Sequence, residues 1–302
     1  MAWREWPLVA FTLLGQLATG FYLFFVVPVM FVGRPAQGSE GRNAILYATA
    51  AVIGMLGVAA AASFFHLGRP LKAPNALSNL RTSWLSREIL FELLFLISLA
   101  GLFVLVWLGR GEGVPAKAAA GLAGSFGILF LVSMARLYMV PGVPAWNRAA
   151  TPVSFFLATM TLGSLGALAV SEVISGAYQI EEGTLLPGPS WLRALTVFAA
   201  ALVALGVVGY VLLTSNHGVL RSRAAASLKP AVASPAVFFV LRFVLLAGCG
   251  LALLAAFRSG LGGGAGTRGG ANLVLIAFGL AAVSELLARF EFYGLGDGRR
   301  SF

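Results

Sequence analysis

Long apolar segments, each sufficient to cross a lipid bilayer, recur along the whole sequence and constrain its fold more than any other feature. A helix needs about 20 apolar residues to cross the hydrocarbon core of a membrane. Segments of this kind run roughly over residues 7–32, 44–65, 87–108, 117–139, 152–173, 191–214, 235–257 and 271–293. The sequence therefore predicts an all-α integral membrane protein in which eight transmembrane helices form a bundle.

The composition supports this prediction and excludes several other classes of protein. Charged residues make up 11% of the chain and the mean hydropathy is +0.90, whereas about a quarter of the residues in a soluble domain are charged. The connections between the apolar segments are too short to fold by themselves, so residues 1–302 are expected to form a single polytopic domain. The lone cysteine, Cys249, excludes an intrachain disulfide and a four-cysteine iron–sulfur site.

The basic residues predict how the chain is oriented in the membrane. Most of the 21 lysines and arginines lie on the side that holds both termini, and Arg242 falls inside the seventh apolar segment. The positive-inside rule places such a side in the cytoplasm, so we expect cytoplasmic N- and C-termini. The net charge of +10 is explained by this topology and by lipid headgroups, and it does not indicate nucleic-acid binding.

Two histidines are the first polar residues that need a reason. His66 ends the second apolar segment, and its side chain can accept or release a proton near neutral pH. An alternative is that it only caps a helix end at the membrane interface. His217 follows the sixth segment on the same side, and two histidines could in principle hold a haem. Both lie beside loops rather than within spans, so haem is the lesser interpretation.

Ionisable and amide groups within the apolar segments form a second set of candidates. Glu88 and Glu92 are four residues apart near the start of the third span, which places them on one helix face. Gln16 lies a few turns into the first span and could face the same polar lining. Intramembrane ionisable groups are usually functional, although pairing with one another for assembly is an equal alternative.

The last two spans carry three further intramembrane charges. Glu285 and Arg289 have the four-residue spacing and the order that favour an ion pair on one helix. Arg242 lies roughly 10 Å into the seventh span at 1.5 Å per residue, a depth from which its side chain can reach the interface. Among the aromatic residues near the span ends, Trp84, Tyr138 and Trp146 suit a belt at the headgroup level or the rim of an entrance for a ring-shaped ligand.

Several motifs together resemble the membrane-anchor subunit of the DMSO reductase family. The most specific is the block from His66-Leu67-Gly68-x-Pro70 through Thr82-Ser83-Trp84-Leu85-Ser86-Arg87-Glu88. Further similarities are Glu5-Trp6-Pro7-Leu8 with Gln16, Arg136-x-Tyr138 with Pro144-Ala145-Trp146-Asn147, and Glu285-Leu286-x-x-Arg289-x-x-x-Tyr293. They occur in the same order as in the family and extend over nearly the whole chain.

This resemblance implies an eight-helix anchor of a bacterial inner membrane that carries no haem. It implies binding of menaquinol or ubiquinol, with the position of His66 taking part, and docking to a four-cluster iron–sulfur subunit that leads to a molybdopterin catalytic subunit. Similar anchors serve sulfite dehydrogenases that deliver electrons to quinone, and the motifs do not separate the two directions. A transporter of ions or solutes is the alternative from another class, because eight spans with intramembrane charges also fit one.

We therefore predict a quinone site at the membrane boundary and a docking face beside it. In the quinone site, His66 takes the proton, Glu88 relays it, Arg87 holds the Glu88 carboxylate and Trp84 forms a wall, while Gln16, Glu92 and Glu285 are the next candidates. The docking face is basic and consists of Arg69, Lys72, Arg81, Arg221 and Arg223. No metal ligands are predicted.

Overall fold

The computed structural model describes residues 5–32, 39–64, 77–178, 189–215, 235–259 and 268–297. Its helices are α1 (Trp6–Phe21), the π-helical turn η2 (Tyr22–Val26), α2 (Val27–Phe31), α3 (Ser39–Phe64), α4 (Trp84–Trp107), α5 (Val114–Leu137), α6 (Ala150–Tyr178), α7 (Pro189–Ser215), α9 (Pro235–Arg258) and α10 (Arg268–Asp297). Across the described ranges, eight helices are long and apolar enough to cross a membrane, α1 to α2 counting as one. The predicted all-α bundle is confirmed.

Two of the helices begin about one turn earlier than their apolar segments suggest. The α4 helix begins at Trp84 because the Ser83 side chain caps it, accepting a hydrogen bond from the Ser86 amide at 3.3 Å. The α5 helix begins at Val114 with Pro115 in its first turn, where the missing N–H of proline removes no helical bond. The caps therefore extend both helices beyond their apolar stretch toward the headgroups.

The first span is interrupted by a π-helical turn that the apolar pattern does not reveal. Pro28 lacks the N–H that would bond to the carbonyl four residues earlier. The chain responds with η2, in which the Val27 amide donates to the Tyr22 carbonyl, a five-residue step. Such single π turns rotate the helix faces before and after them relative to each other.

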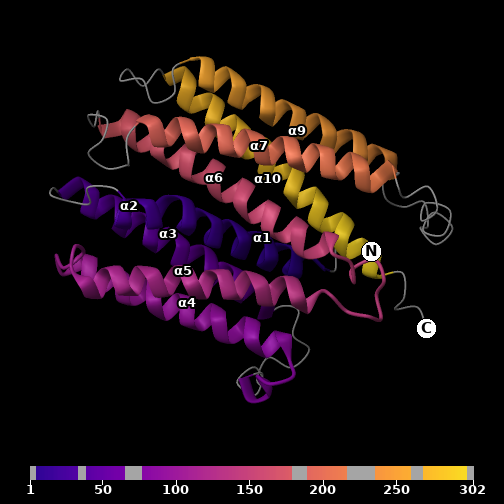
Figure 1. The fold of residues 1–302 in the computed structure, drawn as a ribbon, viewed down its shortest axis with the longest axis horizontal. Coiled ribbons are helices and arrows are strands. Elements are labelled where there is room, and N and C mark those ends of the chain that lie inside the picture. Colours follow the sequence, from indigo (N-terminus) through magenta and orange to yellow (C-terminus); the bar gives the residue numbers. More distant parts are fainter. Residues whose placement is uncertain are drawn as a thin grey trace.

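The helices lie side by side in a layered arrangement with α1 and α6 at its centre (Figure 1). The α4–α5 pair forms one edge, α7 and α9 form the other, and α3 packs between α1 and α4. In the spans that contain α1 and α6, 67% of the apolar window is buried, against 28% in α4, α7 and α9. The central pair is thus shielded from lipid, and α10 reaches both α6 and α1.

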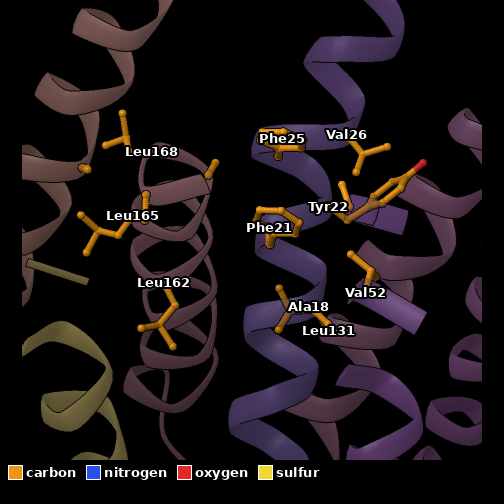
Figure 2. Close-up of a cluster of buried hydrophobic side chains, with 14 of the residues drawn as sticks. Ala18, Phe21, Tyr22, Phe25, Val26, Val52, Leu131, Leu162, Leu165 and Leu168 are labelled. Carbon is orange, nitrogen blue, oxygen red and sulfur yellow. The ribbon is translucent and has the colours of Figure 1, made fainter. Parts of the chain in front are cut away.

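The two central helices approach each other at a pair of glycines. A Cβ atom built on Gly163 of α6 would overlap the backbone of Gly20 in α1, and one built on Gly20 would overlap the carbonyl of Thr159. Next to this crossing, Phe21 lies toward α6 and Tyr22 lies on the other side of the first span (Figure 2). The Tyr22 hydroxyl donates to the Ala120 carbonyl of α5 at 2.7 Å, so the first span connects the two halves of the bundle.

Candidate functional site

A group of polar side chains is buried where α1, α4, α10 and the end of α5 meet, near the membrane side on which α4 begins. We call it the buried polar cluster. Its members are at most 7% exposed: Thr12, Gln16, Glu88, Glu92, Tyr138, Arg289 and Tyr293. Four of them were predicted from the sequence as quinone-site or intramembrane residues, and the fold brings these together from three separate spans.

Gln16 and Arg289 form one end of the cluster. The Arg289 guanidinium donates through Nη2 to Oε1 of Gln16 at 2.8 Å. Its central carbon lies 3.9 Å from the ring centroid of Phe155, an arrangement that stabilises a cation against an aromatic face. The Arg289 Nε atom has no hydrogen-bond partner. The Gln16 amide nitrogen contacts the Met134 sulfur at 3.9 Å, and a thioether is only a weak acceptor.

A pair of tyrosines forms the middle of the cluster. The side chains of Tyr138 and Tyr293 are hydrogen-bonded and their ring centroids are 5.4 Å apart. The Tyr293 hydroxyl donates to Thr12 Oγ1 at 3.4 Å, and Thr12 in turn donates to the Leu8 carbonyl at 2.8 Å. Burial raises the pKa of Tyr138, just beyond the end of α5, well above its usual value, and Tyr293 and Glu88 add to this shift. The Tyr138 phenol therefore stays neutral.

Glu88 and Glu92 form the acidic end, on the inward face of α4. Their side chains belong to residues that are 2% and 6% exposed, and one carboxyl oxygen of each lacks a hydrogen-bond partner. Neither carboxyl group has an ion-pair partner in the part of the chain that the structure describes. A buried carboxyl group without a cation is uncommon, and it is a candidate for proton transfer.

The predicted pairing of Arg87 with Glu88 is not present. Arg87 instead turns outward, where Nε donates to the Leu80 carbonyl at 2.9 Å and Nη2 to the Arg81 carbonyl at 2.7 Å. Its guanidinium carbon lies 4.3 Å from the Trp84 ring centroid. Neighbours along a helix point in different directions, so Arg87 fixes the segment before α4 while Glu88 faces the core.

The predicted ion pair between Glu285 and Arg289 is also replaced by another. Glu285 pairs with Nη2 of Arg242 on α9 at 3.9 Å, and Glu291 approaches Nη1 of the same arginine at 3.8 Å. Arg289 lies on the part of α10 that faces α1 and α6, whereas Glu285 faces α9. These contacts join α9 to α10, in agreement with the alternative that intramembrane charges pair for assembly.

An aromatic group seals the cluster at the membrane surface. Trp146 stacks on Phe292 with a 5.3 Å centroid separation, and its indole N–H donates to the Phe292 carbonyl at 2.8 Å. The Thr151 hydroxyl donates to the Trp146 carbonyl at 2.6 Å. Trp146 and Tyr138, predicted for the headgroup belt, therefore contact the bundle itself and hold the connection between α5 and α6 against α10.

Some predicted residues cannot be placed, and others were missed. His66, Arg69, Lys72, His217, Arg221 and Arg223 lie outside the described residues. Arg81 is exposed at the end of the bundle that carries the cluster. Tyr293 and Phe155 were not predicted as site residues. The four-residue spacing from Arg289 to Tyr293 was a signal for the first, because it places both on one face of α10. No group of metal-ligating side chains occurs among the residues that the structure places.

Comparison with known proteins identifies the family. Residues 1–295 match the family model described as "DMSO reductase anchor subunit (DmsC)". One chain of the anaerobic dimethyl sulfoxide reductase of Haemophilus influenzae is 31% identical over 292 residues, which cover 96% of this protein and 94% of that relative. The chain of the same name from Escherichia coli is 30% identical, with 97% and 95% covered.

A relative that is named for a different activity matches a shorter part of the sequence. A sulfite dehydrogenase subunit of Allochromatium vinosum is 32% identical over 206 residues, which cover 63% of this protein and 60% of that relative. The family model and the two longer matches extend over nearly the whole sequence, and they favour an anchor over a transporter. With its eight membrane-spanning helices, this protein belongs to the family of DMSO reductase membrane-anchor subunits (DmsC).

Proposed function

We propose that this anchor subunit binds menaquinol or ubiquinol at the buried polar cluster and exchanges electrons with a docked iron–sulfur subunit. The observation that carries the proposal is Glu88, a buried carboxyl group with an unpartnered oxygen inside a membrane span. A quinol gives up two protons when it is oxidised, and the first must pass to a group within hydrogen-bond reach. A lipid-soluble substrate also requires that this group lie at membrane depth.

The depth of the cluster suits this role. Glu88 is four residues into α4, which at 1.5 Å per residue is roughly 6 Å from the helix start, and Glu92 is roughly 12 Å from it. A quinone ring near Glu88 would lie close to one membrane surface, while its apolar tail remained in lipid. The proximity also favours electron transfer to a subunit that docks on that surface.

In this proposal the quinol is the substrate and the chain supplies proton acceptors and packing. One ring hydroxyl transfers its proton to Glu88, and His66, at the boundary by sequence, exchanges protons with water. The two electrons pass singly to the nearest cluster of the iron–sulfur subunit and on to a molybdopterin catalytic subunit. Arg87 and Trp84 shape the segment through which the ring enters, and Glu92 lies one turn deeper as a second acceptor.

Replacing His66 tests the proposal by separating quinol chemistry from the rest of the complex. We expect His66→Leu to abolish quinol-dependent turnover, because the proton acceptor at the boundary is lost, while the catalytic subunit still turns over with an artificial dye. The measurement is turnover of the purified complex with each electron donor. Undiminished quinol turnover in an assembled His66→Leu complex would mean that the proton takes another route.

The direction of electron flow has two candidates because the relatives include a sulfite dehydrogenase subunit. The same cluster can take up the protons of a quinol or supply protons to a quinone. Turnover of the purified complex with sulfoxide and quinol, and separately with sulfite and quinone, identifies the direction. Activity with neither pair would remove both substrates.

We further propose that the basic face at the cluster end docks the iron–sulfur subunit. Combined reversal to glutamate at Arg69, Lys72 and Arg81 should release the partner subunits, with an effect that weakens at high salt because exposed charges are screened. Co-purification from mild detergent measures it. The matched control reverses Arg42, Arg110 and Lys117, three exposed residues toward the other ends of the helices. Equal retention of partners in both variants would place the docking face elsewhere, and a C-terminal reporter fusion reads whether that side is cytoplasmic.

A further inference from the structure

The Gln16–Arg289 pair contains hydrogen-bond donors for which the cluster provides no adequate acceptor. Oε1 of Gln16 is occupied by Nη2 of Arg289 at 2.8 Å, which fixes the amide so that its NH₂ group points away from the guanidinium. Among the described residues, that NH₂ group meets only the Met134 sulfur, at 3.9 Å. Nε of Arg289 has no partner there either. Two adjacent donor groups therefore lie buried with their hydrogen-bonding capacity largely unused.

Leaving such donors unmade is costly, so the arrangement calls for an acceptor that a ligand brings. A buried donor without a partner loses about 1–3 kcal/mol, and more when it is charged. The guanidinium also lacks a carboxylate partner, because Glu285 is held by Arg242 and the face toward Phe155 is covered by the ring. Buried cations are normally paired. The missing group is an oxygen atom that carries partial negative charge.

The opposite end of the cluster has the reverse imbalance. Glu88 and Glu92 each keep an unpartnered carboxyl oxygen and have no donor among the described residues. Between the two ends lies the tyrosine pair, which interacts electrostatically both with Glu88 and with Arg289. The cluster thus offers acceptors at one end and donors at the other, separated by aromatic rings. A ring that bears one oxygen at each end has the complementary pattern.

We infer that Nε2 of Gln16 and Nε of Arg289 donate hydrogen bonds to one carbonyl oxygen of the bound oxidised quinone, the oxygen remote from Glu88. This inference rests on the proposed function and adds the polarity with which the ring is bound. The pair transfers neither a proton nor an electron. Arg289 has a second role as a positioning residue, because its bond to Oε1 turns the Gln16 amide so that nitrogen, not oxygen, faces the ligand.

Infrared spectroscopy of the complex with labelled quinone tests the inference directly. The probe is a short-chain menaquinone that carries ¹³C at one or the other ring carbonyl. In the wild-type complex, one labelled carbonyl band should lie at lower frequency than the other, because two donors polarise that carbonyl. Gln16→Met should return this band toward its position for the free quinone and weaken binding of the oxidised quinone about tenfold, the effect of one buried hydrogen bond.

Conservative and control variants keep the outcome interpretable. If Arg289→Met does not assemble, Arg289→Lys retains the charge but loses the planar donor edge, and we expect an intermediate band position. Tyr22→Phe is the control, since it removes another buried inter-helix hydrogen bond of the first span and should leave both bands unchanged.

Two failures can be told apart. Labelled bands that are identical in wild type, Gln16→Met and Arg289→Lys, but are lost in Glu88→Gln, would overturn the donor pair and leave the proposed function intact. Absence of bound-quinone bands from the wild-type complex would overturn both. A symmetric pair of bands in the wild type would likewise contradict the inference.

Discussion

Replacing Glu88 with glutamine is expected to lower quinol-dependent turnover of the assembled complex by about 10²- to 10⁴-fold, the usual contribution of a general base. Glutamine keeps the shape and polarity of the side chain but cannot take the proton of a quinol hydroxyl. Because one carboxyl oxygen of Glu88 makes no hydrogen bond in the bundle, the substitution breaks no partner on that side. The fold and the docking of partners should persist.

The measurement compares turnover with a quinol and with an artificial dye in the same preparation. Glu172→Gln is the matched control, because Glu172 is also buried but lies toward the other end of α6. We expect this control to retain quinol turnover. Comparable losses in both variants would indicate a general effect of removing buried carboxyl groups, and an unaffected Glu88→Gln complex would remove Glu88 from the proton path.

Replacing Gly163 with alanine is expected to disrupt the bundle. Its added methyl group would overlap the backbone of Gly20, and backbone atoms cannot move aside as a flexible side chain can. Overpacking within a well-packed core commonly costs about 1–3 kcal/mol, occasionally more. We expect the upper end of this range or beyond, because α1 and α6 are the two most buried spans and must separate along their length.

Gly166, one turn further along α6, provides the control. A Cβ atom there would meet the Leu17, Phe21 and Phe278 side chains at 3.6 Å, an ordinary contact distance. The unfolding temperature of the detergent-purified protein should therefore fall sharply for Gly163→Ala and change little for Gly166→Ala. Equal unfolding temperatures for the two variants would mean that the helices are not held at this crossing.

The sequence was sufficient for the helices because membrane insertion depends on the length and polarity of continuous segments. It was less informative where hydrogen bonds to particular atoms decide the outcome. The start of α4 depends on the Ser83 cap, and η2 arises because Pro28 removes a donor within an otherwise uniform apolar run. Apolar periodicity carries no record of either feature, so the caps and the π turn became apparent only in the folded chain.

The same distinction applies to the site. The depth and inward direction of Glu88, Glu92 and Gln16 follow from their positions within single spans. Which groups they meet depends on helix neighbours, and spacing along one helix gave the wrong partner for Glu285. Its contact with Arg242 requires that α9 lie beside α10. Tyr138 was assigned to the membrane surface because it follows a span, yet the closure of α10 over it makes it part of the interior.

The attachment of the α5–α6 connection to α10 has a consequence for association. Its Trp146 side chain is fixed by a hydrogen bond and a stacked ring, so this connection has already lost most of its conformational freedom before any partner arrives. Ordering a surface on binding subtracts from affinity, at about 0.5–1.5 kcal/mol for each immobilised side chain. A subunit that docks at this end therefore meets a preorganised template, and the entropic penalty that would slow or weaken assembly has been met during folding.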